Sequence, residues 1–358
     1  MTDRESLPLA RLRAEPWYVD RVTIDGAHVR AEGWSMRVGA REPDEGWFTI
    51  NGRRCDRIAY PLRRDDVGAV FWQRRDAANC GFVAEIDALD DPYPDGMMEI
   101  RRVRADTPRV ERGRDSWFVP DTARHTDLPG DDRRFRVIGD RDARGFLVSG
   151  ATDYRRLDRA LVELTGRRMH EHARALDWGV GCGRVARHVP RSSAQALTGC
   201  DIDHDNVAWC RDHLPGTFVA STLVPPLPFD DDAFDLVYGI SVFTHLREPM
   251  QLRWLAELAR VAQRGAILMM TTHARTAIDF SRLAPDAYTQ TCARVERDGI
   301  VVSGSNAQLD GHADHGGEYV NVYHSDDYVR RTWGCYFEIL AILPGYILHH
   351  DLVVMRKR

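Results

Sequence analysis

The 358-residue sequence is almost without lysine, and it also lacks long apolar runs and paired cysteines. Lys357 is its only lysine, so nearly all basic residues are arginine, a bias that we attribute to a GC-rich coding sequence. The arginines are interleaved with Asp and Glu, as in residues 63–80, and the net charge is −5. This pattern predicts a solvated, salt-bridged surface and argues against nucleic-acid binding.

The other absences bear on location and redox state. No stretch approaches the ~18 apolar residues of a membrane span, and the first residues lack the apolar core of a signal peptide. The seven cysteines are scattered and form no C-x-x-C pair, which argues against a disulfide framework and a cysteine metal cluster. We therefore expect a cytoplasmic protein with no membrane span and reduced thiols, among them Cys182 and Cys200 as small packed residues.

The N-terminal third has the pattern of β-structure. Across residues 17–112, apolar and polar residues alternate around the turn dipeptides at 25–26 (Asp-Gly) and 51–52 (Asn-Gly), which are hairpin signals. Several short strands without a helical period predict a small antiparallel β-sandwich, placed at residues 1–118. Residues 119–135 belong to a stretch rich in Pro, Gly and charge, and they are predicted to be a linker.

From residue 136 onward, the pattern becomes α/β. A helix with Leu157, Leu161 and Leu164 at helical spacing precedes apolar runs that alternate with helical stretches, which predicts a parallel sheet covered on both faces. Two strands joined through residues 344–346 end the chain, and we expect their antiparallel strand to lie at the sheet edge. Residues 274–323 interrupt the sheet. A long insertion at this place usually forms an acceptor pocket or a lid, and we expect the same here.

A glycine-rich loop follows the first of these apolar runs. In LDWGVGCGR, residues 176–184, Gly179, Gly181 and Gly183 occupy alternate positions, which suggests that something approaches the main chain more closely than a Cβ would allow. In open α/β sheets ligands lie beyond the carboxyl ends of the strands, often on backbone amides at a helix N-terminus. Asp201 ends the next strand, at a spacing typical of a carboxylate that binds ribose hydroxyls. The loop therefore predicts a nucleoside site.

The spacing also bears on which nucleoside binds. It reads D-x-G-x-G-x-G rather than the G-x-G-x-x-G of dinucleotide sites. Asp177 would repel a pyrophosphate and attract a sulfonium or ammonium group, so S-adenosylmethionine is favoured over NAD. Three alternatives stay open: an NAD-dependent oxidoreductase, a non-catalytic glycan-binding protein with a degenerate transferase domain, and Asp201 as a helix N-cap instead of a ribose ligand.

Four motifs in order, at residues 176–184, 200–203, 225–246 and 254–273, resemble those of class I S-adenosylmethionine-dependent methyltransferases. The resemblance covers residues 136–358 and includes the terminal hairpin. It implies a Rossmann-like seven-stranded sheet with a reversed C-terminal strand, preceded here by the β-sandwich. It also implies an enzyme that uses S-adenosylmethionine and takes a small-molecule or glycan acceptor. Whether the enzyme forms a homodimer is left open.

The resemblance assigns roles to individual residues. Asp177 would orient the amino group, the glycine loop would back the methionine portion and the ribose, and Asp201 would hold the ribose. Ile202 would lie against adenine, Ser221 and Thr222 stand where the family often reads the adenine amino group, and Ser241 and Val242 would flank the sulfonium. The full predicted cofactor set is Asp177, Gly179, Gly181, Gly183, Arg184, Asp201, Ile202, Asp203, Ser221, Thr222, Ser241 and Val242.

The acceptor chemistry is less constrained. A hydroxyl acceptor needs a base, and His245 and His273, after the fourth and fifth strands, are the candidates. The segment with His312, Asp314 and His315, together with His324, resembles a divalent-metal site, but we predict a polar loop and no metal. IDGAHVRAEGW, residues 24–34, resembles accessory domains of polysaccharide and natural-product pathways. We therefore expect methylation of a hydroxyl on a sugar, glycan or glycosylated natural product, with an amine, phosphonate or carboxylate acceptor as the alternative.

Overall fold

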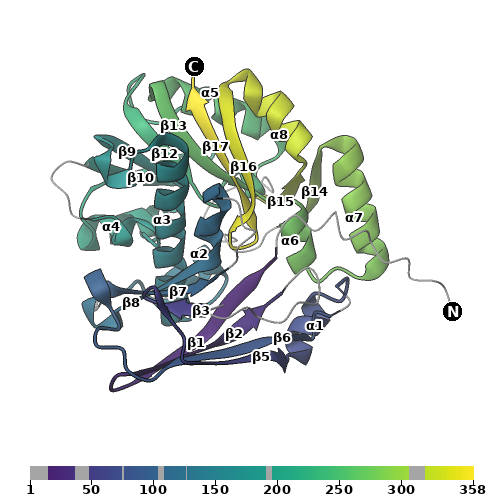
Figure 1. Ribbon diagram of the computed structural model, residues 1–358. Coiled ribbons are helices and arrows are strands. Elements are labelled where there is room, and N and C mark those ends of the chain that lie inside the picture. Colours follow the sequence, from purple (N-terminus) through teal and green to yellow (C-terminus); the bar gives the residue numbers. More distant parts are fainter. Residues whose placement is uncertain are drawn as a thin grey trace.

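The larger part of the protein is built on one seven-stranded sheet (Figure 1). The computed structural model describes residues 15–36, 48–74, 76–103, 109–125, 127–190, 196–305 and 319–358. The strand order is β11-β10-β9-β12-β13-β17-β16. The strands are β9 (Arg174–Trp178), β10 (Ala196–Asp201), β11 (Thr217–Ala220), β12 (Phe234–Gly239), β13 (Ala262–Thr272), β16 (Phe337–Ile347) and β17 (His350–Lys357).

Six of these seven strands run in the same direction, and the last strand of the chain, β17, is reversed. Strands β11 to β13 pair in parallel, whereas β17 is antiparallel to both β13 and β16. This arrangement confirms the predicted Rossmann-like sheet with its reversed C-terminal strand. The expected edge position was wrong, because β17 lies between β13 and β16 and the edge strand is β16. The burial of the two strands agrees with their order in the sheet. Strand β17 is buried from His350 to Met355, as an inner strand is, whereas β16 is only partly buried and carries exposed Glu338.

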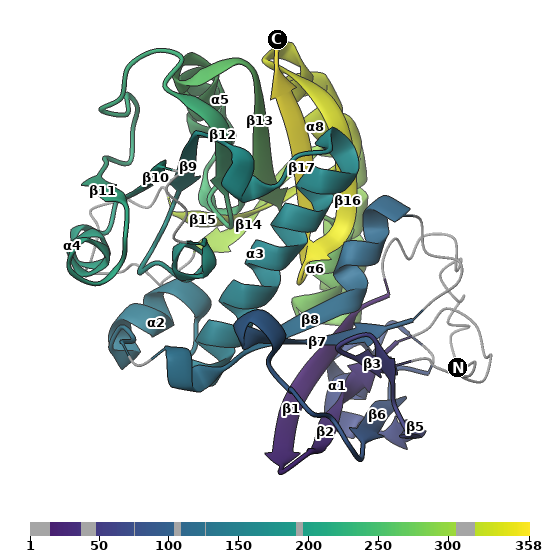
Figure 2. The ribbon, with the colours of Figure 1, turned by 60° about the vertical axis from the view of Figure 1, so that its left-hand side comes forward.

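Helices cover both faces of the sheet, with one apolar core on each side. Figure 2 shows α3 (Ala143–Thr165) crossing one face and α5 (Glu248–Val261) behind the other. Side chains alternate between the two cores along each strand, so that Leu236 faces the α3 side and Val237 the α5 side. The α3 side also includes α4 (His204–His213), and the α5 side includes α8 (Asp326–Thr332). Among the described residues, no helix combines the length and apolar character needed to cross a bilayer.

The N-terminal region consists of two four-stranded antiparallel sheets around a shared apolar core, as the predicted β-sandwich requires. One sheet has the order β1-β2-β6-β5 and the other β4-β3-β7-β8. Their strands are β1 (Trp17–Asp25), β2 (His28–Ser35), β3 (Phe48–Ile50), β4 (Arg53–Arg54), β5 (Arg57–Arg63), β6 (Asn79–Ile86), β7 (Met97–Arg102) and β8 (Ser116–Pro120).

Three features of the predicted domain plan differ in the structure. A helix that the sequence pattern did not indicate, α1 (Asp65–Val70), lies inside the sandwich region. Strand β8 runs through the predicted boundary at residue 118, and α2 (Asp131–Ile138) begins within the predicted linker at 119–135. The two regions are therefore joined by ordered elements over much of this stretch.

The sandwich and the large sheet are held together by α3, which packs against β8. The buried guanidinium of Arg156 donates hydrogen bonds to the carbonyls of Arg114, Ser116 and Tyr346 at 3.0–3.2 Å. These carbonyls come from the end of the sandwich and from β16. One buried cation thus ties both parts of the fold to the same helix, and burial lowers its pKa to about 10.

The predicted insertion at 274–323 includes α6 (Arg275–Phe280), α7 (Pro285–Asp298) and the antiparallel pair β14 (Ile300–Ser305) and β15 (Val320–His324). It contacts the sandwich next to α1, as Figure 1 shows. The ring of Phe280 lies 4.8 Å from that of Phe71, and Trp72 donates its indole hydrogen bond to the carbonyl of Leu283 at 3.0 Å. The insertion is therefore braced from the N-terminal side.

Replacing Arg156 with Met should lower the free energy of unfolding by about 2–4 kcal/mol, because three buried carbonyls lose a charged donor. Arg159→Met, on the same helix, is the matched control: Arg159 is partly exposed and pairs with Glu99, so its loss should cost about 1 kcal/mol or less. Urea unfolding at neutral pH measures both. Equal destabilisation by the two variants would show that Arg156 does not join the two parts.

Candidate cofactor site

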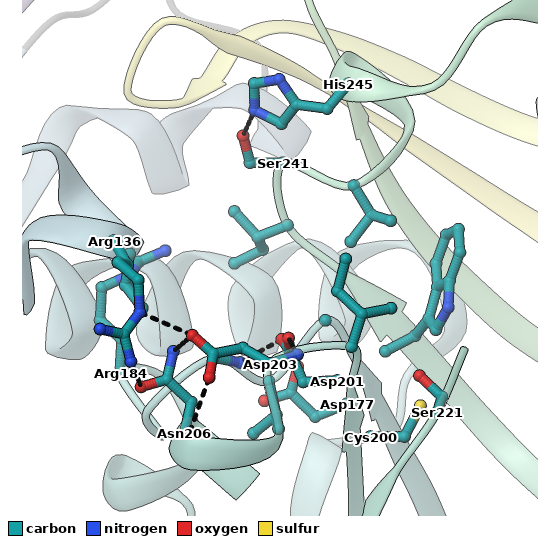
Figure 3. Close-up of a pocket in the computed structure, with 18 of the residues that line it drawn as sticks. Arg136, Asp177, Arg184, Cys200, Asp201, Asp203, Asn206, Ser221, Ser241 and His245 are labelled. Atoms are coloured by element: carbon teal, nitrogen blue, oxygen red, sulfur yellow. Dashed lines mark hydrogen bonds and ion pairs between the residues drawn. The ribbon is translucent and has the colours of Figure 1, made fainter. Parts of the chain in front are cut away.

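A pocket opens at the carboxyl ends of β9, β10 and β12 (Figure 3). Of the residues predicted from the sequence, the pocket is lined by Asp177, Gly179, Gly181, Arg184, Asp201, Ile202, Asp203, Ser221, Ser241, Val242 and His245. Gly183, Thr222 and His273 are not among its lining residues. Local sequence patterns thus identified most of one wall, and the structure brings these residues together from the ends of four strands, β9, β10, β11 and β12.

The glycine loop is shaped by its own backbone and by neighbouring side chains. Gly179 and Gly183 have φ values of 82° and 76°, in the left-handed region that favours glycine. A Cβ on Gly179 would lie 2.4 Å from Val242 Cγ2, and one on Gly183 would lie 2.2 Å from Leu214 Cδ1. The close approach expected from the spacing therefore exists, but in these contacts the approaching groups are protein side chains. Gly183 packs against α4 and does not face the pocket.

Asp201 fastens the glycine loop to the end of β10. The amide of Gly181 donates to its Oδ2 at 2.7 Å, and the amide of Asp203 donates to its Oδ1 at 2.8 Å. Each carboxylate oxygen can accept a second hydrogen bond, so ribose hydroxyls could still bind there. The N-cap of α4 is Asp203, whose side chain accepts from the amide of Asn206. The alternative interpretation of Asp201 as the N-cap is therefore wrong.

Two arginines enter the pocket wall (Figure 3), and each has a carboxylate partner of its own. Arg136 of α2 forms a buried ion pair with Asp203 at 2.7 Å, and Arg184 pairs with Asp153 of α3 at 2.6 Å. Arg136 was not among the predicted site residues, because most of α2 falls within the predicted linker. Tyr319 was not predicted either, because it lies within the insertion and belongs to no motif.

Two carboxylates in the pocket are destabilised in their charged form. Burial raises the pKa of Asp177 to about 7. Burial also raises the pKa of Asp201 to about 6, although its hydrogen bonds from backbone amides oppose that shift. A buried carboxylate of this kind gains most from a cation or from hydroxyl donors, and perturbed groups in a cleft are typical of functional sites.

His245 lies in the 3₁₀ turn Phe243–His245, which follows β12. Its hydrogen bond with Ser241 is on the side of the ring that faces the pocket. Its Nδ1 lies 2.9 Å from the carbonyl oxygen of Val320, which can only accept, so Nδ1 carries the proton. The Nε2 lone pair then accepts from the hydroxyl of Ser241 at 3.1 Å. Burial lowers the pKa of His245 to about 4, which keeps the ring neutral at physiological pH. Ser241 has a φ of 62°, a strained backbone of the kind that clusters at functional sites.

The other predicted residues lie elsewhere. His273 is buried behind His245, with ring centroids 6.0 Å apart, and stacks on His350 at 4.7 Å. Thr222 is exposed and donates its hydroxyl hydrogen bond to the carbonyl of Val224. His324 is buried next to the amide of Gln251. The predicted polar loop with His312, Asp314 and His315 lies outside the described residues.

The central part of the chain, which supplies most of the pocket, is similar to known methyltransferases. Residues 176–270 match the family model described as "Methyltransferase domain". Over 113 residues the chain is 33% identical to phthiotriol/phenolphthiotriol dimycocerosates methyltransferase 1 of Mycobacterium ulcerans. That match covers 31% of this chain and 39% of the relative, so the chain spans about two fifths of the length of this curated protein.

Solved structures with a similar chain path include two methyltransferases. One is a SAM-dependent methyltransferase from Methanosarcina mazei, 18% identical, with a TM-score of 0.38, covering 52% of this chain and 93% of that chain. The other is magnesium protoporphyrin IX methyltransferase from Synechocystis PCC 6803, 16% identical, with a TM-score of 0.42, covering 66% of this chain and 97% of that chain.

Asp177→Asn should change how the stability of the ligand-free protein depends on pH. The pKa of Asp177 is raised from 3.8 to about 7 on folding, so the folded state holds a proton that the unfolded state has lost between these values. The free energy of unfolding should therefore fall as pH rises from about 4 to about 7, and the variant should lose part of this slope.

At pH 8 the Asp177→Asn variant should be more stable than the parent by roughly 1–4 kcal/mol. Urea unfolding at a series of pH values measures the slope, and exposed Asp205→Asn on α4 is the control, which should keep it. An unchanged slope in Asp177→Asn would mean that this carboxylate is not destabilised by burial.

Proposed function

Since residues 176–270 are a methyltransferase domain, with S-adenosylmethionine as cofactor, we propose that the chain transfers a methyl group to a hydroxyl of a sugar, a glycan or a glycosylated natural product. S-adenosylmethionine supplies that methyl group on a sulfonium centre with an excellent leaving group. The protein's task is to bind the donor, to align the acceptor oxygen with it, and to take up the hydroxyl proton. Alignment by held geometry can contribute roughly 7–11 kcal/mol.

The donor set of the pocket fits the cofactor. Asp177, with its raised pKa, would hold the ammonium group, and Asp201 would accept hydrogen bonds from the ribose hydroxyls. Ile202 and Leu223 offer an apolar surface for the adenine, and Ser221 a hydroxyl beside it. Ser241 and Val242 would flank the sulfonium at the end of β12.

The charges of the pocket argue against a dinucleotide. A pyrophosphate would face the carboxylates of Asp177 and Asp201. The two arginines of the wall are already engaged by Asp203 and Asp153, which lowers their value as partners for a second anion. A ligand with a positive charge next to its ribose removes this repulsion.

The observation that carries the hydroxyl acceptor is the hydrogen-bonded state of His245. Its protonated Nδ1 is held by Val320, so Nε2 is presented to Ser241 as an acceptor at the edge of the pocket. A neutral imidazole so placed can take the proton of an attacking hydroxyl, a contribution typically worth 10²–10⁴-fold. A carboxylate acceptor, already ionised at neutral pH, needs no such base. We therefore assign the base to His245 and not to His273.

Two further observations support this class of acceptor. The relative from Mycobacterium ulcerans is named for phthiotriol, a hydroxyl-bearing compound. In addition, Trp34 of the accessory-domain motif at residues 24–34 packs near Phe280 of the insertion, with ring centroids 6.4 Å apart. The sandwich would then help to shape the acceptor side, where a bulky glycosylated substrate needs a large surface.

Calorimetry with S-adenosylmethionine, S-adenosylhomocysteine and NAD tests the cofactor assignment. We expect both sulfur ligands to bind and NAD not to, with S-adenosylmethionine binding more tightly as pH rises through about 7, where Asp177 ionises. Asp201→Asn should weaken binding roughly 10–100-fold, because a charged acceptor of the ribose is lost. Asp205→Asn should bind like the parent. Binding of NAD alone would overturn the proposed function.

Replacing His245 with Gln should slow methyl transfer about 10²–10⁴-fold while the dissociation constant of S-adenosylmethionine stays nearly unchanged. Transfer of a tritiated methyl group to a panel comprising a glycosylated polyol, a free polyol, an amine and a carboxylate measures the acceptor class. His213→Gln on α4 is the control and should keep full activity. Full activity of His245→Gln on a hydroxyl acceptor would remove His245 from the reaction.

A further inference from the structure

Three histidines from distant parts of the sequence meet behind the candidate base. His273 follows β13, and His349 and His350 lie at the turn between β16 and β17. One ring nitrogen from each of the three lies within 4.8 Å of the others. The ring centroids are 4.2 Å apart between His349 and His350 and 4.7 Å apart between His273 and His350. We call these three residues the histidine cluster.

The hydrogen bonds of the cluster leave ring nitrogens unsatisfied. His350 Nδ1 lies 3.2 Å from the carbonyl oxygen of Ile347, so it donates there and its Nε2 carries a lone pair. That Nε2 and the Nδ1 of His273 are buried and have no hydrogen-bond partner among the described residues. A buried polar atom without a partner is costly. Histidines that bind metals typically donate their second ring nitrogen to a backbone carbonyl, as His350 does.

The charge state of the cluster also suits a metal. Burial lowers the pKa of His349 to about 4, and burial together with the neighbouring imidazoles lowers the pKa values of His273 and His350 well below their usual range. A neutral imidazole, with a free lone pair on one ring nitrogen, is the form that binds metals. Three imidazoles favour zinc and similar transition metals over magnesium or calcium, which prefer oxygen ligands.

We propose that His273, His349 and His350 bind one divalent transition-metal ion of the zinc type and leave one coordination position open. Zinc sites with three protein ligands commonly hold water or substrate in the fourth position. Zinc–nitrogen distances of about 2.0–2.1 Å place the ligand nitrogens about 3.4 Å apart in a tetrahedron, so the rings turn slightly on binding. This site departs from the expectation of a protein without a metal.

The position of the cluster suggests what the open coordination position would take. The ring of His273 lies 6.0 Å from that of His245, and His349 lies 5.6 Å from Phe280 of the insertion. The metal would thus lie between the candidate base and the insertion, on the side where the acceptor would bind. That last step rests on the proposed function, whereas metal binding by the cluster does not.

The test uses the full chain, stripped with a chelator and then titrated with Zn²⁺ and with Co²⁺. We expect one metal per chain by elemental analysis, and the visible absorption of tetrahedral Co²⁺. His349→Gln, His273→Gln and His350→Gln should each weaken metal binding by about 10-fold or more, as loss of a ligand requires. His349 is only partly buried, so its variant is the one least disruptive to folding.

Two controls separate the cluster from other histidines. His188→Gln removes a buried imidazole that lies outside the cluster, and this variant should bind metal normally. The double variant His312→Gln/His315→Gln tests the polar loop as an alternative site and should also bind normally. Absence of stoichiometric metal, or loss of metal only in the double variant, would overturn the proposal.

Calorimetry with S-adenosylmethionine on the same samples keeps the two proposals apart. Cofactor binding without metal binding would overturn the metal site alone. Metal binding that depends on the cluster, in a protein that does not bind the cofactor, would overturn the proposed function and leave the metal site standing. His349→Gln should keep the cofactor affinity of the parent, which also shows that the variant is folded.

Discussion

Two carboxylates with raised pKa values, near the ends of two adjacent strands, are the constraint on which the site depends. Asp177 is buried one residue before the end of β9, and burial raises its pKa to about 7. The charge of Asp201 is partly compensated by hydrogen bonds from the amides of Gly181 and Asp203. The glycine loop takes its left-handed turns to reach Asp201. The charged form of both groups is therefore least costly when a cationic nucleoside fills the pocket.

The next two strands, β12 and β13, place histidines in different surroundings at the same edge of the sheet. His245 is turned by Val320 so that Nε2 addresses Ser241 and the pocket. His273 is turned inward toward His349 and His350. The same residue type thus serves one proposed role in proton transfer and another in metal binding, and the distinction comes from the hydrogen bonds around each ring.

The N-terminal sandwich takes part in this arrangement through the insertion. Phe71 and Trp72, at and just after the end of α1, contact Phe280 and Leu283, so the segment after β13 is braced against a second unit. Arg156 holds that unit to the large sheet. Under the proposed function, a substrate on the acceptor side would therefore meet a surface built from both parts of the chain.

Local patterns in the sequence determined the sandwich, the alternation of strands and helices, the glycine loop and Asp201, because each is recorded in residues that are close together along the chain. The tertiary structure alone decided that β17 lies inside the sheet, that Gly183 faces α4, and that Arg136 reaches the pocket. It also brought His273 to His349 and His350. These outcomes depend on which distant segments pack together, and burial of apolar surface specifies such contacts through the whole fold and not through any short motif.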